Sequence, residues 1–297
     1  MSRNRQIVLI TAAALALYVG VRLLPVGSSV NHMDFRLEGK GAIEFCDPAN
    51  PQFIPVVLAR SPVVMKLKSD RPPVRGEPAE FTLTLGTASG KPIGPADLIV
   101  AHTRKLHLLV VDPTLSDYQH LHPEPGRNPG EWKFTMTPTR AGDYRVFADF
   151  TPAATQRGLY AATDFNVPGT VADVINAGNT TWNDFGFRFE LVLPPVLNAG
   201  VPADLRFRIE SPGAKKEPVP LQPVMDAFAH LVAFDEARSG FAHLHPMETD
   251  LAVPPDPLRP ELNFKITIPQ PGRYVIWAQV NLGGREIFVP FWVDVLP

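Results

Sequence analysis

Two short segments decide the fold: Lys105-Leu106-His107-Leu108-Leu109-Val110-Val111 and Tyr118-Gln119-His120-Leu121-His122-Pro123. The pattern recurs 123 residues further along the chain, where a histidine is followed after twelve residues by His-Leu-His-Pro. Six of the eight histidines of the chain lie in these two copies: His107, His120, His122, His230, His243 and His245. The chain is therefore predicted to contain two copies of one unit.

The repeat extends beyond the histidines. Each copy continues into an alternating run and then a strand that begins Gly142-Asp143-Tyr144 in the first copy and Gly272-Arg273-Tyr274 in the second. The second copy has the longer loop, within the proline-rich stretch at 254–257. A repeat of more than a hundred residues is too long for a solenoid unit and has the length of a whole domain.

Alternation of apolar and polar residues with period two, as in Ala79–Leu85, predicts strands with one buried face. Each copy contains seven short strand-like segments with turn residues between them, and the first of the second copy is Phe185–Leu193. The 33 prolines argue against long helices. We predict an all-β protein with two tandem antiparallel Ig-like or cupredoxin-like β-sandwiches. They occupy residues 61–167 and 184–297, and a linker rich in Gly, Asn and Thr joins them at 168–183.

The N-terminus has the pattern of an export signal. Arg3 and Arg5 precede the apolar run Ile7–Val21, and Arg22 follows it. Residues 1–27 are predicted to form either an uncleaved signal-anchor transmembrane helix or a cleaved signal, followed by a connector at 28–60. The first alternative gives an inner-membrane protein facing the periplasm, and the second a protein of the cell envelope or a secreted one. Cys46 is the only cysteine, so an intramolecular disulfide is impossible.

A hairpin model brings the histidines of each copy together. If Asp112 pairs with Asp117, then His107 lies opposite His122, and His120 points to the same face. The second copy behaves in the same way. Because neutral imidazole is the commonest metal ligand, each set of three is a candidate site for a copper or zinc ion.

The fourth ligand is less evident from the sequence. Asp149 is a candidate in the first copy, where the second copy has Gln279. His102 precedes the first set and aligns with Met225, and Met247 follows the second set. A thioether ligand would suit copper, and a carboxylate would suit zinc or copper(II).

The histidine pattern is also compatible with two roles besides metal handling. The ring N–H groups could bond loop carbonyls and merely order a hairpin, or a three-histidine site could bind another ligand or activate water. No general base is identifiable nearby, and the chain has no Gly-rich phosphate loop, Gly-x-Ser-x-Gly elbow or CxxC motif. We therefore predict a protein that is not an enzyme.

The histidine segments and the strand Gly142–Phe150 resemble a family of exported bacterial proteins with YtkA-like and FixH-like β-sandwich modules. The resemblance covers about residues 61–295 and implies export and a sandwich fold more than a function. Periplasmic copper chaperones are a looser comparison, since their pattern ends in His-x-Met where this chain has His-x-His.

Together these observations predict a membrane-anchored envelope protein that handles or delivers a transition metal. The alternative is a structural or interaction module of the cell envelope. The expected partners are a metal ion and the membrane, with another envelope protein as a further candidate. The net charge of −2 gives no reason to expect nucleic acid.

Overall fold

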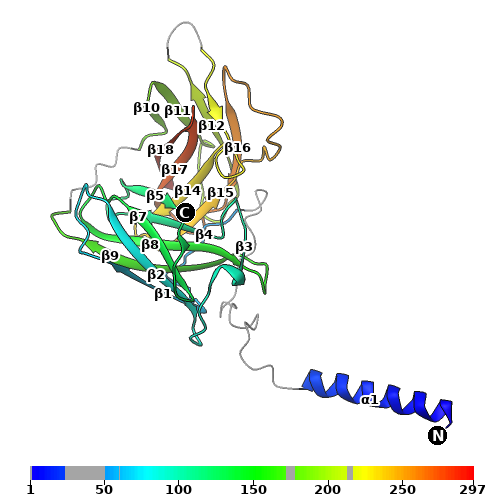
Figure 1. Cartoon of the computed structure of the whole chain (residues 1–297). Helices are drawn as coiled ribbons and strands as arrows, with labels where there is room; N and C mark the ends of the chain where they lie inside the picture. Colours follow the sequence, from blue (N-terminus) through cyan, green and yellow to red (C-terminus); the bar gives the residue numbers. More distant parts are fainter. Residues whose placement is uncertain (1, 24–50, 60, 172–177, 213–216) are drawn as a thin grey trace.

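The two antiparallel sandwiches predicted from the sequence are confirmed. The computed structural model describes residues 2–23, 51–59, 61–171, 178–212 and 217–297, and its strands form four antiparallel sheets, two in each repeat (Figure 1). Of the predicted connector and linker, residues 28–50, 60 and 172–177 lie outside the described residues, as does Cys46.

The first repeat pairs an outer sheet with an inner sheet. The outer sheet has the order β1-β2-β7-β6, with β1 at Val63–Ser69, β2 at Ala79–Thr87, β7 at Glu131–Met136 and β6 at Glu124–Pro125. The inner sheet has the order β3-β8-β4-β5, with β3 at Leu98–Ile99, β8 at Gly142–Pro152, β4 at Leu106–Val111 and β5 at Tyr118–Leu121. Strand β9 (Leu159–Val167) pairs with β8, and a short 3-10 helix, η2 (Pro95–Asp97), precedes β3.

The second repeat has the same plan. Its outer sheet has the order β10-β11-β12-β16, with β10 at Thr181–Asp184, β11 at Phe187–Val192, β12 at Ala203–Glu210 and β16 at Glu261–Ile266. Its inner sheet has the order β13-β17-β14-β15, with β13 at Leu221–Gln222, β17 at Gly272–Leu282, β14 at His230–Asp235 and β15 at Phe241–Leu244. Strand β18 (Arg285–Val295) pairs with β17.

One predicted strand starts too early. The strand expected from Phe185 begins at Phe187, because Phe185 and Gly186 have φ of 54° and 79° and form the turn between β10 and β11. Positive φ at both central residues is what a tight two-residue hairpin turn requires. Strand β10 therefore lies partly within the segment predicted to be a linker.

Each repeat has its own core between its two sheets. Alternate residues of β2, such as Phe81, Leu83 and Leu85, are buried, and their neighbours face outward. The same alternation in β12 buries Leu205 and Phe207 in the second repeat. Period-two burial of this kind is the expected consequence of one apolar face on each outer strand.

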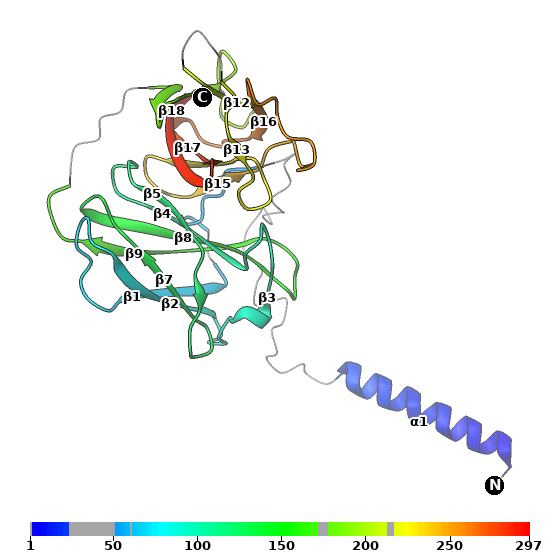
Figure 2. The ribbon, with the colours of Figure 1, turned by 45° about the horizontal axis from the view of Figure 1, so that its top comes forward.

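A third apolar cluster joins the two repeats. It contains Leu109, Val111, Tyr118 and Phe147 from the first inner sheet and Val232, Phe234, Phe241 and Trp277 from the second. All six residues of β4 are buried, because one face covers the first core and the other meets the second repeat. Figures 1 and 2 both show the inner-sheet strand β5 beside the second repeat, in agreement with an apolar contact between the two inner sheets.

The end of the predicted connector packs on the second repeat. Ile54 and Phe241 exchange backbone hydrogen bonds of 2.7 and 3.1 Å, and Phe53 joins the second core. Gly240 makes this close approach possible, since a Cβ there would lie 1.8 Å from the Ile54 carbonyl oxygen. Residues 51–59 are thus a docked segment and not a free connector.

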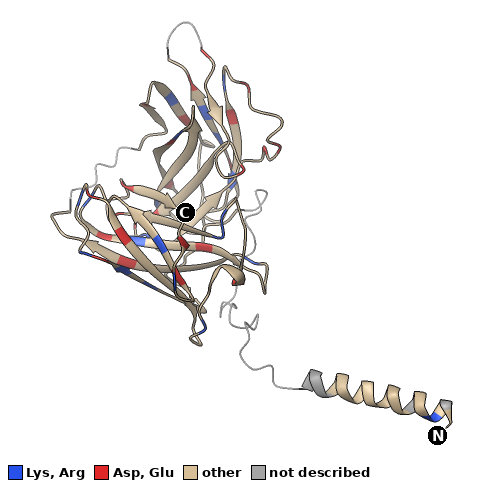
Figure 3. Cartoon of the chain, in the orientation of Figure 1, with Lys and Arg blue, Asp and Glu red and all other residues tan. Residues whose placement is uncertain are grey.

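The N-terminal helix α1 spans Arg3–Leu23, within the predicted signal segment (Figure 1). Residues 24–27 of that segment lie outside the described residues. Among the described helices, none combines the length and the apolar character needed to cross a membrane. The signal-anchor, and its alternative of cleavage, stay predictions. Figure 3 shows acidic and basic residues interspersed along the ribbon of both repeats.

Candidate metal centre

The predicted hairpin register is confirmed in both repeats. Leu109 pairs with His120 across β4 and β5, and Val232 pairs with His243 across β14 and β15. His122 and His245 each follow directly after the second strand of their hairpin. Because side chains alternate along a strand, the three histidines of each copy share one face.

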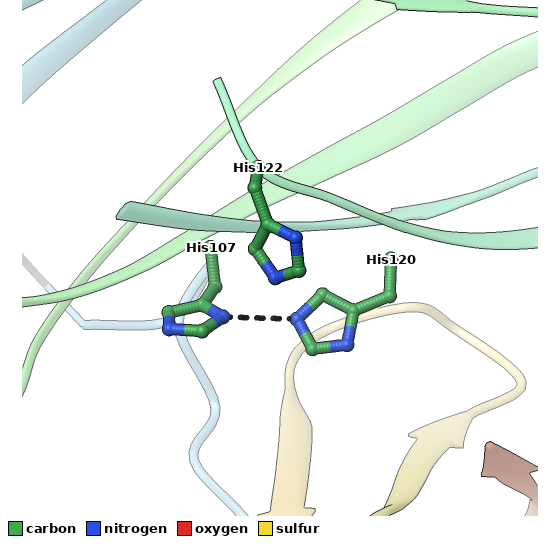
Figure 4. Close-up of side chains that lie close together, drawn as sticks. All are labelled: His107, His120 and His122. Carbon is green, nitrogen blue, oxygen red and sulfur yellow. Dashed lines mark hydrogen bonds between the residues drawn. The ribbon is translucent and has the colours of Figure 1, made fainter. Parts of the chain in front are cut away.

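The histidines of each repeat form a compact cluster, called here the first triad (His107, His120 and His122) and the second triad (His230, His243 and His245). In each triad one ring nitrogen of every histidine lies within 4.8 Å of one nitrogen of the other two. Figure 4 shows the three rings of the first triad turned toward a common point, with His107 Nδ1 3.1 Å from His120 Nε2. The corresponding distance from His230 Nδ1 to His243 Nε2 is 3.3 Å.

The surroundings of the second triad fix which nitrogens carry protons. His230 Nε2 lies 3.0 Å from the Val224 carbonyl oxygen, which can only accept, so Nε2 donates and Nδ1 has a bare lone pair. His243 Nδ1 lies 3.1 Å from a carboxyl oxygen of Asp149, so with the carboxyl ionised Nδ1 donates and Nε2 is bare.

The first triad has the same proton arrangement. His107 Nε2 donates to the Ala101 carbonyl at 2.9 Å, and His120 Nδ1 donates to the Gln279 Oε1 atom at 2.8 Å. The amide of Gln279 is oriented by its Nε2, which donates to Glu286 at 2.9 Å. His107 Nδ1 and His120 Nε2 are therefore both bare.

In neutral histidines, each short N···N contact thus brings together two lone pairs with no proton between them. The third nitrogen of each set is also unsatisfied, because His122 Nε2 and His245 Nε2 are buried without a hydrogen-bond partner among the described residues. Buried polar atoms are nearly always paired, so three unsatisfied nitrogens in each triad need a physical cause. A cation at their centre would satisfy all three.

Burial keeps these imidazoles neutral. Desolvation lowers the pKa of His107 and of His122 to about 4 and that of His230 to about 3. Desolvation, reinforced by neighbouring histidines, also sets the pKa of His120, His243 and His245 well below the usual value. The rings are thus in the protonation state that metal binding requires.

We expect the metal-free protein to lose stability as pH falls from 6.5 toward 4. In that window the unfolded histidines take up protons while the buried ones stay neutral, so the unfolded state is favoured. His107 alone accounts for about 3 kcal/mol, from its pKa of about 4 and 1.36 kcal/mol per pKa unit. Urea unfolding of the full-length, chelator-treated chain at several pH values measures this. The variant His107→Gln should show a shallower pH dependence, and an unchanged slope in that variant would contradict the assignment.

The two triads belong to one interface. The ring centroids of His120 and His243 lie 5.4 Å apart, and the hydrogen bonds of these two rings cross between the repeats. His120 bonds Gln279 of the second repeat, and His243 bonds Asp149 of the first. Asp149 and Gln279 are equivalent positions, since each pairs in register with the leading histidine of its own repeat. The contact is therefore reciprocal, like that of a two-fold dimer.

The candidate fourth ligands named from the sequence differ in where they lie relative to the two triads. Asp149 bonds the triad of the other repeat and not its own. His102 stacks on His245 of the other repeat, with centroids 3.8 Å apart. Met225 is half-buried, and Met247 is 42% exposed. The ring N–H bonds to loop carbonyls, expected if the histidines only order a hairpin, are present as well.

Sequence reasoning missed the interface between the triads, although a signal was available. Leu108–Val111 and Leu231–Phe234 are uninterrupted apolar runs, and such runs indicate strands buried on both faces. If apolar and polar residues alternated in β4 and β14, one face of each strand would be exposed to solvent. The second buried face is where the repeats meet.

Comparisons with known proteins support the duplicated organisation. The sequence profile of the family "Domain of unknown function (DUF8832)" matches residues 61–168 and 182–296, so it covers both repeats. No curated protein matches the sequence. The likeness to YtkA-like and FixH-like modules stays a resemblance.

Three solved structures are similar to this chain. One is a Corynebacterium diphtheriae protein described as membrane anchored, with 8% identity and a TM-score of 0.25 over 78% of this chain and 59% of that chain. A mutant of Salmonella alpha-2-macroglobulin has 12% identity and a TM-score of 0.25 over 79% and 16%. Red sea bream transglutaminase has 8% identity and a TM-score of 0.25 over 80% and 32%. The chain thus spans less than two thirds of each of these proteins.

Proposed function

We propose a metal-binding function for this chain, which belongs to the DUF8832 family: each repeat binds one copper or zinc ion through its histidine triad. The ligands are His107, His120 and His122 in the first repeat and His230, His243 and His245 in the second. The donor atoms are Nδ1 of His107 and His230 and Nε2 of His120, His122, His243 and His245.

The observation that carries this proposal is the inward-facing set of bare nitrogens. A purely structural hairpin would use ring N–H groups to satisfy its neighbours, and would not place two lone pairs about 3 Å apart. The outer nitrogens of both leading rings donate to backbone carbonyls, which is the usual arrangement around metal-bound histidines.

Asp149 supports the same proposal. It is a buried carboxylate, and within the described residues its ion-pair partner is His243, whose pKa is well below the usual value. Desolvation raises the pKa of Asp149, so its ionised form is unfavourable without a nearby cation. A divalent ion held by His243 would supply positive charge through the ring and so favour the ionised carboxylate.

The wider role that fits best is metal handling or delivery at the cell envelope, with the N-terminal segment as membrane anchor and another envelope protein as acceptor. An all-imidazole ligand set suits zinc or copper, and three ligands leave a position open for exchange. The second candidate function is a structural or interaction module without metal, favoured by the large apolar contact between the repeats.

Calorimetric titration of the full-length, detergent-solubilised chain with Zn(II), Cu(II) and Cu(I) tests the proposal. We expect two ions per chain, and loss of both in the double variant His120→Ala, His243→Ala. The matched control is Gln119→Ala, next to His120 in β5 but on the opposite face. Failure of the wild type to bind with Kd below about 100 μM, or undiminished binding by the double variant, would rule metal binding out.

A further inference from the structure

We infer that the first repeat completes the metal site of the second: Asp149 positions His243, and His102 caps the second triad as its fourth ligand. This rests on the proposed function and goes beyond it. It makes the two sites unequal, although their triads have identical spacing, and it makes the second site a property of the assembled pair of repeats.

The first observation concerns the hydrogen-bond partners of His120 and His243, the second histidine of each triad. His243 donates to a carboxylate of Asp149, whereas the equivalent His120 donates to the neutral amide of Gln279. A carboxylate behind a metal-bound imidazole raises the basicity of the ring and fixes its orientation more strongly than an amide does. The second triad should therefore hold a divalent ion more tightly than the first.

The second step concerns His102. Its ring stacks on His245 at 3.8 Å between centroids and lies 6.2 Å from His230 and 6.1 Å from His243. This histidine, which belongs to neither triad, thus lies near all three rings of the second one, whereas in the first triad it lies near His107, 6.2 Å away. A turn of this half-buried side chain would bring a ring nitrogen to an ion bound there, and would close a four-coordinate site.

The backbone presents His102 under strain. Ala101 and Arg104 close a two-residue turn with backbone hydrogen bonds of 2.8 and 3.1 Å, and His102 and Thr103 at its tip have φ of 48° and 69°. The equivalent turn in the second repeat places Met225 at the same position with φ of 48°. Positive φ at residues other than glycine is costly and concentrates at functional sites. The turn is therefore shared, and only its tip residue differs.

The consequence is a division of roles. The second site gains a fourth imidazole and a supporting carboxylate from the first repeat, so it is suited to hold its ion. The first triad has three imidazoles and an amide, so it keeps an open position and is suited to exchange. Metal in the second site would also bind the repeats to each other.

Single-site proteins allow a direct test. In the His120→Ala background only the second site remains, and there Asp149→Asn should weaken zinc binding about 10–100-fold. In the His243→Ala background only the first site remains, and there the same substitution should weaken zinc binding less, because Asp149 acts on His107 by its charge and not as a hydrogen-bond partner. The reverse exchange, Gln279→Glu combined with Glu286→Gln to keep the hydrogen bond between these two side chains, should tighten zinc binding by the first site in the His243→Ala background. A gain of affinity cannot result from misfolding.

His102 is tested in the same way. In the His120→Ala background, His102→Ala should lower zinc affinity about tenfold or more, since a lost ligand should cost at least as much as a lost supporting group. It should also remove one coupled nitrogen from the electron paramagnetic resonance spectrum of the Cu(II) form. Met225→Ala, at the equivalent turn, is the matched control and should do neither.

The outcomes separate this inference from the proposed function. If the wild type binds no metal, the proposed function fails and the inference with it. If both sites bind but Asp149→Asn weakens the first site rather than the second, or His102→Ala leaves the Kd and spectrum unchanged, the inference is overturned and the proposed function stands.

Discussion

Replacing Phe147 by alanine should lower the free energy of unfolding by about 3–5 kcal/mol and uncouple the two repeats. Phe147 is fully buried at the interface, where its ring lies 6.0 Å from that of Phe234 and 5.4 Å from that of Phe241, both in the second repeat. Its loss leaves a cavity between two sheets whose register depends on this apolar contact. The triads should then separate, and zinc affinity at the second site should fall.

Differential scanning calorimetry of the full-length chain, with zinc titration alongside, measures both effects. The matched control is Phe81→Ala, which removes an equally buried ring from the core of the first repeat, where it stacks on Phe134. The control should lose similar stability while zinc affinity at the second site is kept. A single transition and unchanged zinc affinity in Phe147→Ala would show that the repeats stay linked without this ring, and would contradict the prediction.

Zinc at a hundredfold excess over its Kd should raise the free energy of unfolding by about 2.7 kcal/mol for each site, or about 5 kcal/mol for the chain. The physical reason is that the folded state alone holds three imidazoles within reach of one ion. Chemical unfolding of the full-length chain with zinc and with chelator measures the increment.

The double variant His120→Ala, His243→Ala should show no zinc increment. Without zinc, the variant should lose much less stability relative to the wild type than it loses with zinc. The reason is that each substitution also removes one of two facing lone pairs. If the histidines only ordered their hairpins, the variant would instead lose the same stability with and without zinc. That result would favour the interaction module.

Much of the fold could be predicted because its causes are local. Alternation in segments such as Ala79–Leu85 places one face of a strand in a core, and the pairing of Asp112 with Asp117 across a short turn sets the hairpin register in which Leu109 meets His120. Turn chemistry is harder to predict. Phe185 has the pattern of a first strand residue but lies at positive φ in a turn, because the hairpin needs that conformation regardless of the residue's own preference.

The membership of each triad was likewise determined by the sequence, since pleat and register put His107, His120 and His122 on one face whatever lies beyond it. Only the tertiary structure decided what lies there. That Asp149 serves His243 and that His102 lies on His245 depend on two sheets more than a hundred residues apart meeting face to face. Such a contact arises from apolar burial, which is non-directional, so no spacing in the sequence records which surfaces will meet.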